Sequence, residues 1–359
     1  MKADVPRREN FWRSRRAVGI WLLALAAIIL GMIVVGGLTR ITGSGLSITE
    51  WDPILGAIPP LSDAAWHEAF AKYRRIPQYV HENAGMSLAA FKGIFWWEWA
   101  HRLLGRFLGF AFFVPFVWFA WAGAIRRDAW PRMLLLFALG GLQGFVGWWM
   151  VESGLETRVS VSQYRLAIHL GVALILLVAM VWTALDYLRR AAPAALRRDR
   201  PVRSTWAIGF AVLVYLQMLL GALVAGLHAG LLYNTWPSMD GRVFPEHPFF
   251  AAPWWINVFE NPGLAQFDHR IGAYLVAAVA VVVAAQARRL TGWARRSGVA
   301  VLHLTLLQIV LGIATLLLQA PEFLAAAHQL VAALLLCTAV WHCFERRNGG
   351  LVRDEGKIA

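Results

Sequence analysis

The feature that most constrains this chain is a series of eight apolar stretches, each about as long as a helix that crosses a bilayer. They lie near residues 17–38, 97–124, 133–151, 164–187, 206–227, 267–287, 298–319 and 323–344. A membrane-spanning helix needs about 20 mostly apolar residues. Only 15% of the residues are charged, against about 25% in a soluble domain. The sequence therefore predicts an all-α membrane protein with eight transmembrane helices, and it excludes a disordered chain, a secreted disulfide scaffold and an ordinary cytosolic enzyme.

The positive charge of the chain is explained by membrane topology. A formal net charge of +13 would suggest nucleic acid in a soluble protein, but the basic residues lie mostly in short loops, so no nucleic-acid partner is expected. The basic segments are the leader Arg7–Arg16, the loops near 125–132, 188–205 and 288–297, and the tail after Glu345. The positive-inside rule then places both termini in the cytoplasm, and the two long loops, 39–96 and 228–266, outside. The first stretch is interpreted as an uncleaved helix, because no small-x-small cleavage site follows it before Gly36.

The last four apolar stretches repeat the first four. His101-Arg102 matches His269-Arg270, Leu142-Gln143 matches Leu307-Gln308, and His169 matches His328. Four helices return the chain to its starting side, so a duplication gives two bundles in the same orientation. We predict two repeated four-helix bundles, residues 1–190 and 191–359.

Four of the ten histidines lie near the outer ends of predicted helices: His101, His169, His269 and His328. A single such residue could be an interhelical hydrogen-bond donor, but polar residues inside a membrane are costly and usually functional. Imidazoles from facing helices can hold a haem from both sides. Zinc prefers three or four ligands, often with HxxxH or HExxH spacing, which these residues lack. We predict one haem site in each half.

The remaining histidines and the two cysteines are given structural interpretations. We interpret the other histidines as solvated or snorkelling side chains: His67, His81, His228, His247, His303 and His342. Cys337 and Cys343 fit neither a zinc site nor a redox CxxC motif, and we expect them to be buried packing thiols.

The halves differ by one carboxylate. Glu98 lies three residues before His101, one helical turn away, whereas the matching position before His269 is Gln266. A carboxylate beside a haem-binding histidine can move protons or stabilise a cationic intermediate. The alternative is an interfacial glutamate paired with Arg102 or Lys92. We therefore expect a substrate in the first half and a permanent redox cofactor in the second. The nearby Trp96, Trp97 and Trp99 either line the entrance to the first pocket or anchor the helix at the interface.

These residues resemble the haem A synthase family, from about Val18 to Glu345. The likeness rests on Gly36-Gly37-Leu38-Thr39-Arg40, Thr42-Gly43-Ser44-Gly45-Leu46-Ser47, Glu50-Trp51, Glu98 and His101-Arg102. It implies an inner-membrane enzyme that oxidises the C8 methyl group of haem O to a formyl group, giving haem A for cytochrome oxidase. The formyl oxygen would come from water, and electrons would leave through a bound haem b. Some members carry a cysteine pair in the first outer loop, and this chain lacks it.

The resemblance also assigns roles to individual residues. It implies that His269 and His328 ligate haem b, that His101 and His169 hold the substrate haem, and that Glu98 is the essential acid. The haem sites would face the periplasm. Haem O synthase is an expected partner, while the electron acceptor and a homo-oligomeric state stay open.

Two other functions compete with this interpretation. A dihaem cytochrome b that transfers electrons would place its irons at different depths, and a haem carrier would need no carboxylate. Glu98 favours an enzyme over a carrier. Arg40, Arg102 and Arg270 are candidates to pair with haem propionates or to snorkel to lipid headgroups.

Overall fold

The computed structural model describes residues 14–192 and 204–348. The leader before Ser14, most of the basic loop at 188–205 and the end of the basic tail lie outside the described residues. The described part contains eight helices long and apolar enough to cross a membrane, which confirms the predicted fold class. They are α1 (Arg15–Ile41), α4 (Leu88–Trp121), α5 (Trp130–Glu152), α6 (Gln163–Ala191), α7 (Thr205–Gly226), α9 (Pro262–Ala287), α10 (Gly292–Leu317) and α11 (Glu322–Asn348).

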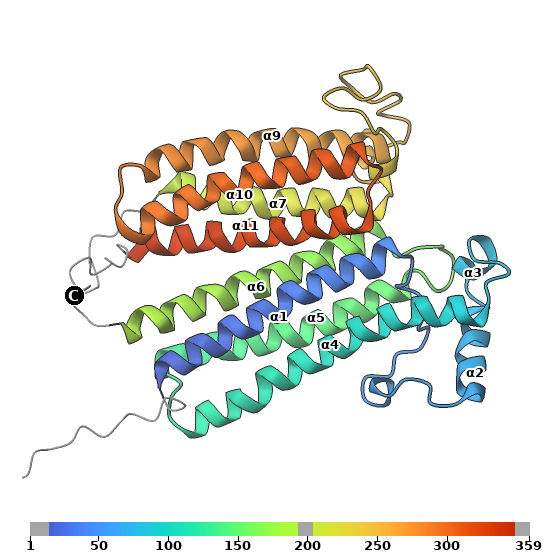
Figure 1. The fold of residues 1–359 in the computed structure, drawn as a ribbon, viewed down its shortest axis with the longest axis horizontal. Coiled ribbons are helices and arrows are strands. Elements are labelled where there is room, and N and C mark those ends of the chain that lie inside the picture. Colours follow the sequence, from blue (N-terminus) through green and yellow to red (C-terminus); the bar gives the residue numbers. More distant parts are fainter. Residues whose placement is uncertain (1–13, 193–203, 349–359) are drawn as a thin grey trace, which may run out of the picture.

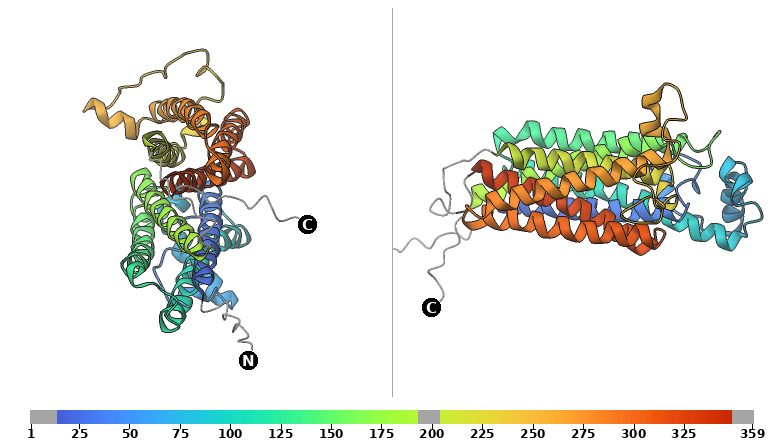
Figure 2. Two further views of the ribbon diagram at one scale, coloured as in Figure 1. Left: turned by 90° about the vertical axis from the view of Figure 1, so that its left-hand side faces the viewer. Right: turned by 90° about the horizontal axis from the view of Figure 1, so that it is seen from above.

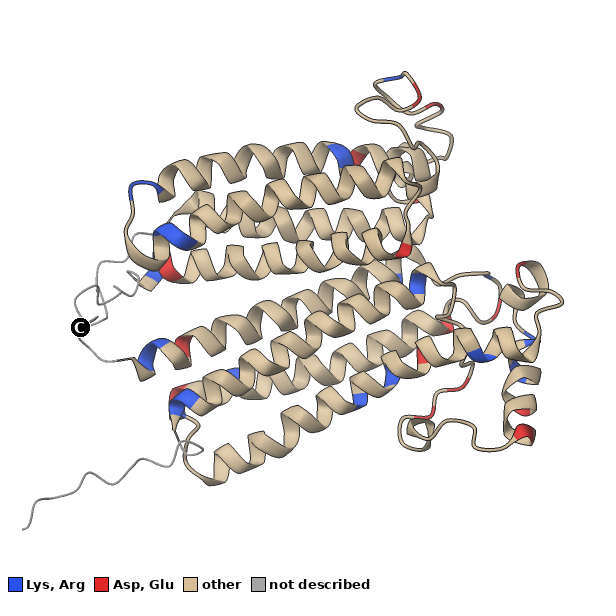
Figure 3. Ribbon diagram, viewed as in Figure 1, with Lys and Arg blue, Asp and Glu red and all other residues tan. Residues whose placement is uncertain are grey.

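These helices run up and down as one elongated bundle (Figure 1). The start of α1 and the end of α11 lie at the same end. The two long loops lie at the opposite end, which we call the loop end. Lys, Arg, Asp and Glu are concentrated toward the two ends of the bundle, as Figure 3 shows. The long central part is almost entirely apolar, as a chain needs to be in order to sit in hydrocarbon.

The helix bounds differ from the apolar stretches at two places. Helix α4 begins at Leu88, where the Ser87 side chain accepts a hydrogen bond from the Ala90 backbone N–H, although its apolar stretch begins near 97. Helix α10 begins at Gly292 rather than near 298. The first turns of both helices carry polar residues such as Lys92, which end a hydrophobic run without ending a helix.

The first long loop contains helices that the apolar pattern did not predict. It forms a short helix η2 (Leu55–Ala57), α2 (Asp63–Tyr73) and α3 (Pro77–His81). Helix α2 packs on the projecting start of α4, with Trp66 against Phe95 at a ring-centroid distance of 4.9 Å. Figure 2 shows this group standing beyond the end of the bundle. The loop is therefore a folded cap on the loop end.

The second long loop is less regular. It contains only short helices: η5 (Ala229–Leu231), η6 (Trp254–Ile256) and α8 (Asn257–Glu260). A further short helix, η3 (Arg127–Ala129), precedes α5 at the other end of the bundle.

The eight helices form two groups of four. In the second group, α7, α9, α10 and α11 each pack on two neighbours and close a ring. In the first group, α4 packs on α1, α1 on α6, and α6 on α5, while α4 and α5 meet at only a few residues. Helices α1 and α6 of the first group pack against α7 and α11 of the second. A continuous apolar core, with Leu22 on α1 and Leu177 on α6 at its centre, joins the groups.

Candidate functional site

The two histidines of the second group face each other across the bundle. The rings of His269 on α9 and His328 on α11 have centroids 6.4 Å apart, with their planes at 78°. Metal–imidazole bonds run about 2.0–2.1 Å, so imidazoles on opposite sides of one metal ion have their rings about 6 Å apart. The separation suits two imidazoles that ligate one ion from opposite sides.

Each of the four predicted histidines packs its ring on a glycine of a neighbouring helix. A Cβ atom at that glycine would lie 2.8–3.1 Å from the Cε1 atom of the imidazole. The pairs are His101 with Gly36 of α1, His169 with Gly147 of α5, His269 with Gly221 of α7, and His328 with Gly312 of α10. Only glycine leaves room for each ring in its present position.

Three of these glycines follow a glutamine on the same helix by four residues. The Gln217 amide donates to Nδ1 of His269 at 3.0 Å and to its backbone oxygen at 2.7 Å. Gln143 donates in the same way to His169, and Gln308 lies 3.3 Å from Nε2 of His328. A partner on one nitrogen of a ligating histidine fixes the orientation of its ring. The Gln-x-x-x-Gly spacing recurs in the sequence of α5, α7 and α10, and it is the local signal that locates these glycines.

The histidines of the first group share part of this arrangement. The rings of His101 on α4 and His169 on α6 each pack on a glycine, and His169 also has a glutamine partner. The Nδ1 atoms of His101 and His328 are buried without a hydrogen-bond partner. Buried polar atoms normally have a partner, so an unpaired ring nitrogen inside a bundle fits a site that awaits a ligand.

The donor set fits haem iron better than a bare metal ion. Within residues 14–192 and 204–348, no group of three or more His, Cys, Asp and Glu side chains could hold a metal. Structural zinc takes four protein ligands, whereas haem iron needs only axial ligands from the protein. Two imidazoles per half therefore match a haem.

Both histidine sites lie at one depth. His169, His269 and His328 each stand six or seven residues from the loop-end start of their helix, about 10 Å at 1.5 Å per residue. An electron carrier that spans the bilayer would place its two centres at different depths. This arrangement places both at the loop end.

Glu98 is buried and fully bonded. Its side chain is 3% exposed. One carboxylate oxygen accepts from the Ser47 hydroxyl and the Ile48 backbone N–H, both at 2.7 Å, and the other accepts from Arg102 at 2.5 Å. Glu98 thus holds the Ser47–Ile48 segment of the first long loop onto α4.

Gln266 occupies the equivalent place in the second half. It is 3% exposed, its amide donates to the Ala229 backbone oxygen at 2.8 Å, and its oxygen accepts from Arg270 at 3.0 Å. In both halves a polar residue and the arginine four residues after it secure a loop, and the histidine lies between them in the sequence. The two contacts differ in polarity: both oxygens of Glu98 accept hydrogen bonds, whereas the Gln266 amide donates one to a loop carbonyl.

The three candidate arginines bind backbone oxygens. Arg102 donates to Ile48 and Glu50, and Arg270 to Tyr233 and Ser238. Arg40, at the end of α1, donates to the Ala225 oxygen at 3.1 Å and contacts Nε2 of His228 at 2.8 Å. It therefore links the first half to the turn after α7. The burial of His228 and its positive neighbour Arg40 lower the pKa of its imidazole.

Other sequence expectations have mixed outcomes. His342 is not a solvated or snorkelling side chain, because it is 2% exposed and its Nδ1 lies 3.0 Å from the Ser297 hydroxyl. His303 is exposed on the apolar surface of α10. Cys337 and Cys343 are free and partly buried.

The tryptophans of α4 join that helix to the cap. Trp96 packs edge to face on Trp66 of α2 and on Trp99, with ring-centroid distances of 5.7 and 5.3 Å. They do not line the pocket described next.

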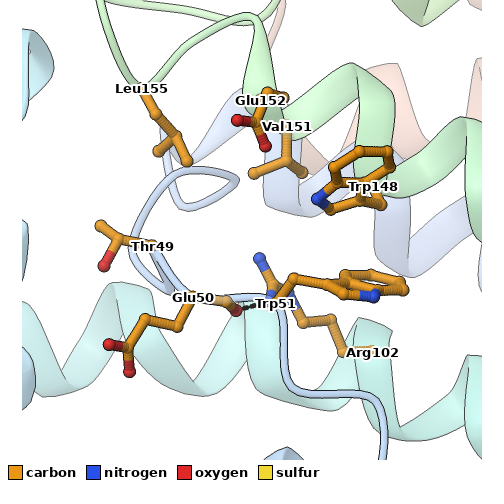
Figure 4. A pocket seen from close by; sticks show the side chains of 8 residues that line it. All are labelled: Thr49, Glu50, Trp51, Arg102, Trp148, Val151, Glu152 and Leu155. Carbon is orange, nitrogen blue, oxygen red and sulfur yellow. Dashed lines mark hydrogen bonds between the residues drawn. The ribbon is translucent and has the colours of Figure 1, made fainter.

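A small pocket lies at the loop end of the first half (Figure 4). One wall comes from the first long loop and α4, and the other from α5 and the turn after it. The lining residues are Thr49, Glu50, Trp51, Arg102, Trp148, Val151, Glu152 and Leu155. Arg102 and Trp148 adjoin His101 and the His169-contacting Gly147 in sequence, so the pocket lies beside the first histidine pair.

Comparison with known proteins matches this arrangement to one family. Residues 19–340 match the family of cytochrome oxidase assembly proteins. A haem A synthase of Bradyrhizobium diazoefficiens is 52% identical over 328 residues, 90% of each chain. A haem A synthase of Rhodopseudomonas palustris is 52% identical over 91% of this chain and 90% of its own. One from Brucella anthropi is 51% identical over 92% of each.

Proposed function

The chain belongs to the cytochrome oxidase assembly family that contains the haem A synthases, and from that premise we propose a division of labour between its two halves. The enzyme oxidises a methyl group of haem O to a formyl group and so makes haem A. His101 and His169 hold the substrate haem in the first half. His269 and His328 hold a permanent haem b in the second, which accepts electrons from the reaction.

The observation that carries this proposal is the difference between Glu98 and Gln266. The two halves share the histidines, the glycines beneath them and the arginine that secures each loop. Only the first half has a carboxylate in the loop contact. An ionisable group is needed where protons move and not where an electron carrier is merely bound. The first half is therefore the reactive one.

Glu98 is positioned to receive protons through its own contacts. Conversion of a methyl to a formyl group, with water as the oxygen source, releases protons at the substrate. The Ser47 hydroxyl and the Arg102 guanidinium both contact the Glu98 carboxylate. Arg102 also lines the pocket at the loop end together with Glu50 and Glu152. Polar side chains therefore lie between the Glu98 carboxylate and the surface at the loop end.

The membrane orientation follows from the charges of the sequence. Both termini lie in the cytoplasm, and the loop end with both haem sites faces the periplasm. The basic loop that joins Arg288 and Arg289 to Arg295 lies at the end opposite the loop end, in agreement with the positive-inside rule. A haem O synthase in the same membrane would supply the substrate.

The proposal is tested by pigment analysis of single variants. Purified protein should contain haem b together with haem O or haem A. His269→Ala and His328→Ala should each lose the low-spin haem b, since each removes one of two axial ligands. His101→Ala should keep haem b and lose the second pigment. Retention of full haem b with an unchanged spectrum in both second-half variants would overturn the assignment.

A further inference from the structure

The two groups of four helices differ in one contact. Helix α9 packs along α10 in the second half, whereas the corresponding helices α4 and α5 of the first half barely meet. The other three contacts within each half are extensive. The backbones of α4 and α5 therefore lie apart along one seam of the first half, whereas the four helices of the second half pack closely on all sides.

Aromatic side chains bridge the seam at both ends. Far from the loop end, Phe113 of α4 packs on Phe137 of α5 at a ring-centroid distance of 6.0 Å. At the loop end, Trp51 of the first long loop and Trp148 of α5 stand on opposite walls of the pocket, and their rings contact each other with centroids 6.4 Å apart. The open part lies between these two points.

Glycines face the open part from α5. Phe137, Gly141, Gly144 and Trp148 are spaced by four, three and four residues, so they share one face of α5. Because Phe137 contacts α4 and Trp148 lines the pocket, this face is the one turned toward α4. A Cβ atom added at Gly141 or Gly144 would meet nothing within 4 Å.

The wall on α4 has the same character. Arg102, Gly109 and Phe113 lie on one face by the same spacing, with Arg102 in the pocket and Phe113 on Phe137. A Cβ atom at Gly109 would also meet nothing within 4 Å.

The second half carries larger residues at the aligned places. When Gln143 is aligned with Gln308, Gly141 corresponds to Leu306 and Gly144 to Ile309. Helix α10, which bears these residues, packs closely on α9. The open seam is therefore a property of the first half alone.

Two buried polar atoms in the first histidine site lack partners. They are Nδ1 of His101 on α4 and Oε1 of Gln143 on α5. The same atoms of His328 and Gln308 are also unpaired, so these atoms mark a ligand site in each half, and the seam leads to the one in the first half.

We propose that the seam between α4 and α5 is the lateral entrance through which the haem substrate passes between the bilayer and the His101–His169 site. This rests on the proposed function of the first half. A substrate must enter and its product must leave at every turnover, whereas a permanent cofactor is retained by a closed ring of helices. The flat ring of a haem is apolar apart from its propionates, so it can enter from lipid, and glycines let it pass close to the helix backbones.

The test fills the seam with the residues of the closed half. Gly141→Leu and Gly144→Ile would be compared with the native protein and with Gly209→Ile. Gly209 is an exposed glycine of α7 with nothing within 4 Å of its would-be Cβ. Haem O uptake by the purified protein is followed by absorbance. The absorbance change that disappears in His101→Ala is assigned to binding in the first half. Haem b content reports correct folding of each variant.

The seam variants should take up and release haem O at least about tenfold more slowly, which corresponds to about 1.4 kcal/mol of added barrier. Haem b should stay at the native level in both, and Gly209→Ile should behave as the native protein does. If both seam variants take up and release haem O at native rates, and this uptake still depends on His101, the entrance is overturned and the proposed function is not. Absence of His101-dependent uptake in the native protein would overturn the proposed function and the entrance with it.

Discussion

The position of each imidazole ring depends on a glycine of the facing helix, which has no side chain. The four histidine rings occupy space that a Cβ atom of the facing glycine would fill. Overpacking of this kind typically costs about 1–3 kcal/mol. The glycines therefore belong to the sites as much as the histidines do, although they have no functional group.

We predict that Gly312→Ala loses haem b. The new methyl group would lie 2.8 Å from Cε1 of His328, so the ring must turn away from its partner His269. Haem b per protein after purification is the measurement, and Gly209→Ala is the matched control. A full complement of haem b in Gly312→Ala would show that this glycine does not set the position of the ring.

At the scale of elements, each long loop is secured by one arginine on a transmembrane helix. Arg102 donates to two loop carbonyls and to Glu98, and Arg270 does the equivalent with Gln266. The planar guanidinium serves several acceptors at once, which a lysine ammonium cannot reproduce. These contacts place the loop over the histidine sites.

Arg102→Lys should loosen the first loop without unfolding the helices. Hydrogen bonds to charged groups contribute about 1.5–3 kcal/mol, so the Ile48 amide should exchange its hydrogen at least about tenfold faster. Hydrogen–deuterium exchange by mass spectrometry measures this. Arg270→Lys is the control, because it should loosen residues 233–238 and leave Ile48 protected. Equal protection of Ile48 in Arg102→Lys would contradict the role of this arginine.

The positions of the helices can be predicted from the sequence where their apolar side chains face lipid. All eight spans follow from the apolar stretches, but the starts of α4 and α10 and the helices of the cap do not. Lys92 and the α2 residues are polar because they stand outside hydrocarbon, and hydropathy does not distinguish a polar helix from a loop. The capping serines, Ser62 and Ser87, are the local signals that mark these starts.

For the whole molecule, the sequence located the residues of the site but not their contacts. The four histidines and the Glu98–Gln266 difference were visible from the internal match alone. The contact of Glu98 with Ser47 and Ile48 depends on how a loop folds back some 50 residues away in sequence, which no local pattern encodes. The seam likewise depends on how α4 and α5 pack, and the internal repeat alone would predict that they pack as α9 and α10 do.

The orientation of the whole bundle is open to a direct test. Reporter fusions after Ala192 and Arg295 should be cytoplasmic, and fusions near Ser62 and Gly241 should be external, because Lys and Arg favour the cytoplasmic side. Each pair of fusions serves as the expression control for the pair on the other side of the membrane. A cytoplasmic signal near Ser62 would invert the bundle and place both histidine pairs on the other face.

The charge of Glu98 is proposed to take part in the reaction and not only to hold the loop. Glu98→Gln removes the charge and keeps one oxygen as an acceptor, and Gln266→Glu is the reciprocal control. Protection of the Ile48 amide from hydrogen exchange shows whether the loop contact survives in Glu98→Gln. The ratio of haem A to haem O is measured in cells with the variant as their only copy, at matched protein level. We expect this ratio to fall by about 10²-fold or more in Glu98→Gln, with haem b retained, and to stay near native in Gln266→Glu. A native ratio in Glu98→Gln would contradict this role and would leave Glu98 as a structural residue.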